Sequence, residues 1–117
     1  MQLSSSRAFD REEMLERLGG DDELLNDVLE VFLEECPRMM GEIVEAVSGQ
    51  DVELVHRSAH SIKGALLNIS AAAAAEEAKR LEAMAAEASL DGSYGALERL
   101  QTEIDRLQRA LVEQSAG

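Results

Sequence analysis

The sequence is poor in the residues that several classes of protein depend on. Its 117 residues include no Trp, one Pro and one Cys, and only 3% are aromatic. A single cysteine, Cys36, cannot form an internal disulfide, which agrees with a reducing compartment. Its position in the apolar spacing of a predicted helix favours a buried small hydrophobe over a nucleophile. No run approaches the roughly 20 apolar residues of a membrane span, and the first residues do not resemble a signal peptide, so we expect a cytoplasmic protein.

Basic residues are also scarce. Eleven Lys and Arg face 24 Asp and Glu, which gives a formal net charge of −13. Phosphate backbones and anionic lipids attract basic faces, so we expect neither a nucleic acid nor a membrane as a main partner. Most of the acids are predicted to lie on solvated helix faces.

Strong helix formers make up much of the chain, since Ala, Leu and Glu supply 50 of the 117 residues. No useful run alternates with the period of a strand, so we predict an all-α protein. Turn and cap residues divide the chain into one short and four long helices, with Asp10 and Asp51 as predicted N-caps. The expected helices cover residues 11–18, 22–48, 52–68, 71–88 and a last segment that contains 97–111.

Apolar residues recur three or four positions apart in each long helix, and the connections are short. This pattern predicts an up-down antiparallel four-helix bundle with the short N-terminal helix packed across one end. We expect one domain over residues 1–117, with a core of about 10–113. Pro37 is predicted to kink the second helix without breaking it. The predicted core faces include Leu25, Val28, Leu29, Phe32, Cys36, Met39, Met40, Ile43 and Val47; Ala74, Ala78, Leu81, Ala85 and Ala88; and Leu97, Leu100, Ile104, Leu107 and Leu111.

In the third helix, one face carries the candidate chemistry. A helical wheel groups the core residues Val55, Ala59, Ile62, Leu66 and Ile69 on one side. His60 points away from them, and Gly64 lies one turn further along the outward face. Glycine costs about 1 kcal/mol against alanine inside a helix. We predict that it leaves the imidazole uncovered for a close partner; the alternative is that it relieves crowding between helices.

The charge around His60 departs from that of the whole chain. The 22 positions from Leu54 to Ala75 contain no Asp or Glu, and only Arg57 and Lys63 are charged. Exclusion of carboxylates suggests an anionic partner or intermediate, which a phosphoryl group fits. Imidazole is a nucleophile near neutral pH, and Lys63, three residues further on, can reach toward phosphoryl oxygens.

The segment from His60 to Ser70, HSIKGALLNIS, resembles the signature of histidine-containing phosphotransfer (HPt) domains. His60, Lys63, Gly64, Ala65, Asn68 and Ile69 match it. The earlier segment FDREEMLERLGGDDELLNDVLEVFLEE also looks like the beginning of these domains in multi-step phosphorelays. Ser70 stands where the family usually has Gly, and we expect it to N-cap the next helix instead.

The resemblance implies a phosphocarrier of two-component signalling that accepts a phosphoryl group from a receiver-domain aspartate and passes it to another receiver aspartate. His60 would be the phosphorylation site, Lys63 its electrostatic partner and Gly64 the access position. The protein would not be an enzyme and would need no cofactor: every glycine except Gly64 is predicted to end a helix, so no phosphate loop is present. Magnesium would belong to the receiver. The partners would be receivers of a hybrid histidine kinase or a response regulator, met one at a time by a monomer.

Neighbouring residues are candidates for supporting roles. We predict that His56, Arg57, Leu67 and Asn68 contribute to docking of the partner. Glu82 on the fourth helix is a candidate to orient the imidazole by accepting a hydrogen bond from the nitrogen that is not phosphorylated. The alternative for Glu82 is an ordinary solvated acid.

Two other functions stay open. The i, i+4 spacing of His56 and His60 suits a zinc site, but only Glu53 could join them on that face and Lys63 would repel a cation, so no metal is assigned. The other possibility is a non-catalytic helical adaptor whose histidine has no chemistry.

Overall fold

A computed structural model describes residues 8–116, with side chains as far as residue 113. All the regular structure in this part of the chain is helical, as predicted. The five helices are α1 (Arg11–Arg17), α2 (Asp22–Ser48), α3 (Val52–Asn68), α4 (Ala72–Ala86) and α5 (Ser93–Ala116). Their bounds lie within two residues of the predicted ones for the first four helices.

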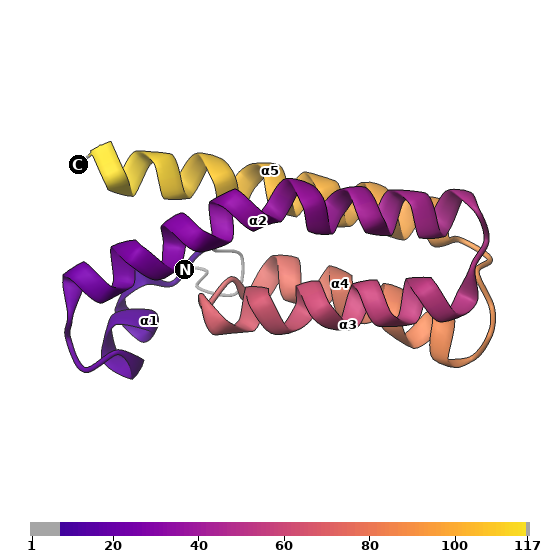
Figure 1. The fold of residues 1–117 in the computed structure, drawn as a ribbon, viewed down its shortest axis with the longest axis horizontal. Coiled ribbons are helices and arrows are strands. Elements are labelled where there is room, and N and C mark those ends of the chain that lie inside the picture. The colour runs from indigo at the N-terminus through magenta and orange to yellow at the C-terminus, as the bar shows by residue number, and fades with distance from the viewer. Residues whose placement is uncertain (1–7, 117) are drawn as a thin grey trace, which may run out of the picture.

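The four long helices form a bundle in which each packs against the next one in the chain, and α2 also packs against α5 (Figure 1). The contact between α3 and α4 is the most extensive. The longer helices α2 and α5 extend past the ends of α3 and α4, and α1 lies beside this overhang. Among residues 8–116, no helix is long and apolar enough to cross a membrane.

Three of the helices have an aspartate as N-cap. The side chains of Asp10, Asp21 and Asp51 each accept a hydrogen bond from the backbone N–H three residues further on, at 3.0, 3.0 and 3.1 Å. Each satisfies a donor that the first turn of a helix leaves without an intrahelical partner. The predicted caps at Asp10 and Asp51 are therefore confirmed.

The core follows the predicted apolar spacing closely. On α3, the predicted stripe is fully buried. On α4, small residues face the core and allow close helix packing, although Ala88 lies beyond the helix in a turn at φ +57° and is exposed. Val28 and Leu97 are only half-buried, because each lies at the edge of its stripe where solvent reaches it. Cys36 is buried as predicted, and burial raises the pKa of its thiol.

The helix α2 runs through Pro37 without a break, as predicted. The prediction that every glycine but Gly64 ends a helix is wrong. Gly41 lies inside α2 and Gly95 lies in the first turn of α5. Packing of the apolar face of α2 outweighs the backbone entropy that one interior glycine costs, about 1 kcal/mol.

Ser70 does not cap α4, which corrects a prediction. Its backbone adopts the left-handed conformation at φ +58°, and α4 begins after Ala71 without a side-chain cap. The N–H of Ala71 bonds to the carbonyl of Leu66 at 2.9 Å and the N–H of Ser70 to that of Leu67 at 3.1 Å. This pair of bonds is the Schellman motif that ends many helices, and the left-handed residue in it is usually glycine.

Candidate functional site

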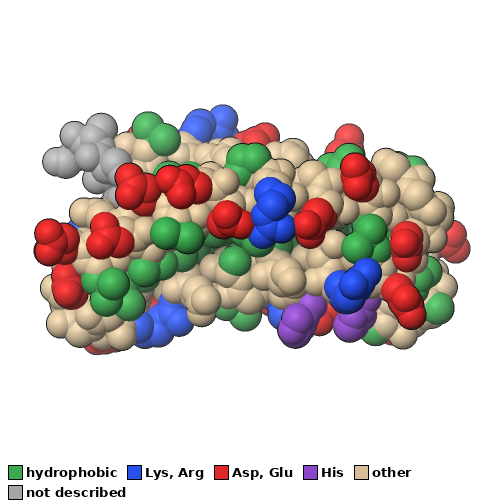
Figure 2. All heavy atoms as spheres, viewed as in Figure 1, with side chains coloured by type: hydrophobic (Ala, Val, Ile, Leu, Met, Phe, Trp, Pro, Cys, Tyr) green, Lys and Arg blue, Asp and Glu red, His purple; other side chains and the backbone are tan. Residues whose placement is uncertain are grey.

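The outward face of α3 carries an exposed histidine pair. His56 and His60 lie one turn apart, on the side of α3 opposite its buried stripe. Figure 2 shows the two histidines side by side, below a row of acidic side chains along α2. The side chain of His60 retains 66% of its accessible surface, so its ring is open to an approaching molecule.

Glu82 on α4 reaches across to this histidine. Its Oε2 lies 2.7 Å from Nδ1 of His60, although 22 residues separate the two in the chain. The Glu82 side chain is only 16% exposed, so it is held at the α3–α4 seam. The predicted contact between Glu82 and His60 is present, and the alternative of a freely solvated acid does not describe this side chain.

Lys63 binds the other oxygen of the same carboxylate, with its Nζ 2.6 Å from Oε1 of Glu82. The pKa of Glu82 is lowered, chiefly by the hydrogen bond from Lys63 and also by that from His60, while burial acts in the opposite direction. Glu82 is therefore ionised near neutral pH and can only accept hydrogen bonds.

Ionisation of Glu82 decides which nitrogen of His60 holds the proton. A carboxylate acceptor at Nδ1 requires that Nδ1 carry the hydrogen. The neutral imidazole then has its lone pair at Nε2, on the opposite edge of the ring. In this tautomer the ring can act as a nucleophile through Nε2, with a lysine and a carboxylate nearby.

Gly64 leaves open space next to this histidine. A Cβ built on it would have no atom within 4 Å beyond the neighbouring backbone of its own helix. Crowding between helices therefore does not explain this glycine, which removes the alternative considered from the sequence. The bare stretch of backbone remains available for contact from outside.

The other predicted site residues lie on both sides of the histidine instead of around Glu82. Toward the start of α3, His56 and Arg57 line a depression of about 480 Å³ that Glu53 also borders. Toward the end of α3, Asn68 lines a groove against α2 of about 240 Å³, and Leu67 is 51% exposed.

The α2 side of this groove was not predicted from the sequence. It is mainly apolar, and Val31 is 58% exposed. Val31 falls outside the core spacing of α2, which is the signal that could have revealed it. The residues that line the groove are Val28, Val31, Phe32, Glu35, Met39, Ala65, Asn68 and Ile69.

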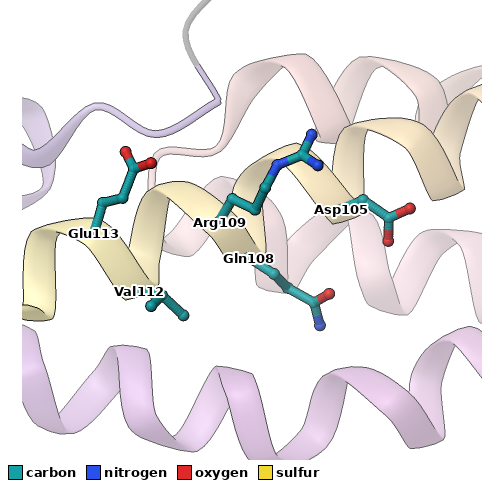
Figure 3. A pocket seen from close by; sticks show the side chains of 5 residues that line it. All are labelled: Asp105, Gln108, Arg109, Val112 and Glu113. Carbon is teal, nitrogen blue, oxygen red and sulfur yellow. The ribbon is translucent and has the colours of Figure 1, made fainter.

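No group of three or more His, Cys, Asp or Glu side chains within residues 8–116 is arranged to hold a metal ion. Another depression, of about 480 Å³, lies on the surface of α5 (Figure 3). The side chains of Asp105, Gln108, Arg109, Val112 and Glu113 that line it all come from that one helix, and it includes none of the predicted site residues.

Comparison with known proteins agrees with this geometry. A family model described as the Hpt domain matches residues 27–110, more than two thirds of the chain, and the match contains His60, Lys63 and Glu82. No curated protein and no solved structure matched the chain. The chain therefore belongs to the Hpt domain family, whose members are phosphotransfer modules of phosphorelays.

Proposed function

We propose that this protein accepts a phosphoryl group from a receiver-domain aspartate onto His60 and passes it to the aspartate of another receiver. The observation that carries the proposal is the 2.7 Å contact between Glu82 and Nδ1 of an otherwise exposed His60. The proposed scaffold is a single up-down four-helix bundle that carries the phosphoryl group without a kinase activity of its own. The packing of each long helix against the next supports this arrangement.

The proposed transfer uses the lone pair at Nε2. This nitrogen attacks the phosphorus of the aspartyl phosphate, the N–P bond forms, and the bond from phosphorus to the carboxylate oxygen breaks, releasing the receiver's carboxylate. The Nδ1 proton stays in its hydrogen bond to Glu82, whose negative charge offsets the positive charge that develops on the ring. Transfer to the second receiver reverses these bond changes.

Lys63 has two roles in this proposal. In the resting protein it neutralises Glu82 and holds it at the seam between α3 and α4. Its place one turn beyond His60 also puts its ammonium within reach of a phosphoryl group on that histidine, where a positive charge stabilises the transferring oxygens.

The surface around His60 supports docking of a receiver. The bare backbone at Gly64 permits close approach, and the exposed Leu67 continues into the apolar groove that Asn68 lines. On the other side of His60, His56 and Arg57 add polar contacts and positive charge. Donor and acceptor would compete for this one surface, so we propose a monomer that meets receivers in turn.

The test is transfer of label from a panel of receivers carrying radioactive aspartyl phosphate, with His60→Gln as the matched control. Label that is lost in acid but survives alkali, on the wild type alone, would support phosphohistidine at His60. Equal labelling of the Gln variant would contradict the assignment. No transfer from a broad panel would also contradict it and favour the adaptor function.

A further inference from the structure

The short helix α1 is fastened to the end of the helix that carries His60. Nη2 of Arg17 lies 2.9 Å from the carbonyl of Leu67, 2.8 Å from that of Asn68 and 2.9 Å from Oγ of Ser70. A second attachment runs from the backbone N–H of Asp10 to the carbonyl of Ser70 at 3.1 Å. The two hydrogens of Nη2 are thus shared among three acceptors in four consecutive residues.

Electrostatics explain why a guanidinium occupies this place. The last carbonyls of a helix have no intrahelical partners and form the negative end of its dipole, so a cation there is stabilising. The same bonds brace the left-handed backbone of Ser70. Met14, which is 1% exposed, anchors α1 in the core and so fixes the base from which Arg17 reaches. The Hpt family match begins at residue 27, so α1 lies outside it.

The end of α3 that Arg17 holds is also the end that we assign to receiver docking. The two carbonyls it binds belong to Leu67 and Asn68, whose side chains face the exposed apolar surface and the groove. The side-chain bonds of Arg17 go to this turn and not to His60, Lys63 or Glu82, so its action on that site would be indirect.

We propose that α1 acts as a clip, by which we mean a helix that holds the end of α3 in place through Arg17. Arg17 is then a positioning residue, because it keeps the last turn of α3 in the conformation that presents Leu67 and Asn68 to the receiver. This inference rests on the proposed phosphotransfer function. Without the clip, the receiver has to order this turn as it binds, and that ordering weakens association. The chemical step is unaffected because the contacts of His60 with Glu82 do not involve α1.

The experiment measures phosphotransfer from one phospho-receiver to Arg17→Gln over a range of protein concentrations. We expect KM to rise about fivefold to tenfold with kcat unchanged, the pattern of lost binding without lost transition-state stabilisation. Arg17→Lys should recover part of the loss, because lysine keeps the positive charge at the end of α3 but is shorter than arginine and cannot place its ammonium where Nη2 lies. Arg109→Gln is the matched control, since it removes the same charge from α5, which packs against α2 and α4 (Figure 3).

Two further measurements separate this inference from the function on which it rests. Phosphoramidate, a small phosphoryl donor that needs no docking, should label His60 equally in the wild type and in Arg17→Gln. Amide hydrogen exchange should speed up in Arg17→Gln at Ser70 and Ala71, whose N–H groups close the turn.

The outcomes are distinct. If neither phosphoramidate nor receivers label His60, the proposed function fails. If the wild type is labelled by both donors but Arg17→Gln keeps the wild-type KM, or loses kcat at unchanged KM, the clip is overturned. An equal rise of KM in Arg109→Gln would also overturn it, because it would reflect net charge alone.

Discussion

Glu82 binds Nδ1 of His60 through one carboxylate oxygen, at 2.7 Å, and Lys63 through the other, at 2.6 Å. One acid on α4 therefore sets the position of two side chains on α3. In the proposed function the carboxylate orients the ring and selects its tautomer, while the hydrogen bond from the lysine lowers the pKa of the carboxylate.

Replacing Glu82 with Gln should slow phosphotransfer about tenfold, the lower end of the range found when the hydrogen-bond partner of a metal-ligating histidine is removed. An amide oxygen can still accept the Nδ1 hydrogen but cannot offset charge on the ring, and Glu82→Ala should be slower still. Transfer rates from one phospho-receiver measure this. Glu76→Gln, at an exposed position of the same helix, is the control, and an equal loss there would refute the specific role of Glu82.

The same substitution should make stability less dependent on pH. Folding lowers the pKa of Glu82 below its ordinary value of 4.5. The network therefore stabilises the fold above that value, and the stabilisation is lost as the pH falls through the folded-state pKa. We expect Glu82→Gln to be less stable than the wild type by about 1 kcal/mol near pH 7 and the difference to shrink near pH 3. Urea unfolding at the two pH values measures this, and a deficit independent of pH would argue against it.

Gly41 and Gly64 both lie inside helices with open space beside them. Alanine substitutions at these positions should separate an effect on stability from an effect on docking of the receiver. A methyl group added at Gly41 or Gly64 would meet no atom within 4 Å, apart from nearby backbone of its own helix, so alanine at either should stabilise the fold by about 0.5–1 kcal/mol. Only Gly64→Ala should also slow transfer from receivers. Thermal unfolding and transfer assays on the pair test this, and unchanged transfer in Gly64→Ala would mean that no partner approaches that backbone.

Two substitutions of Ser70 should separate the cost of its left-handed backbone from the contribution of its hydrogen bond with Arg17. Ser70→Ala keeps the left-handed backbone but loses the bond from Arg17, so it should destabilise the fold by about 1 kcal/mol. Ser70→Gly loses the same bond but relieves a conformational cost of about 1 kcal/mol, so its net effect should be close to zero. Urea unfolding of both variants measures this. A Ser70→Gly variant that is destabilised as much as Ser70→Ala would contradict the prediction.

Sequence periodicity and capping predicted most of the fold because both are local. Apolar spacing identified the buried stripe of α3, and the aspartate caps placed the helix starts within a residue or two. The turn at Ser70 was mispredicted because a serine before a helix usually acts as a cap, whereas here the end of α3 dictates its backbone. The conformation of the preceding helix end outweighed a local preference.

Contacts between distant parts of the chain were harder to predict. Glu82 was a candidate because it lies on the flank of the neighbouring helix, but the shared carboxylate between His60 and Lys63 needed the structure. The bond from Arg17 to the end of α3 could not be predicted. Arg17 is 50 residues away from Leu67, and nothing in its local sequence indicates a bond to another helix.

The alanines on the buried face of α4 bear on the contact between Glu82 and His60, although they lie in the core. A glutamate side chain is short, and Glu82 can span the seam because Ala74, Ala78 and Ala85 let α4 lie close to its neighbours. We expect the small size of these methyl groups to bear on the distance between acid and imidazole. A larger residue there is expected to move Glu82 away from His60 without touching either side chain, so the smallest side chains of the core would bear on a contact at the surface.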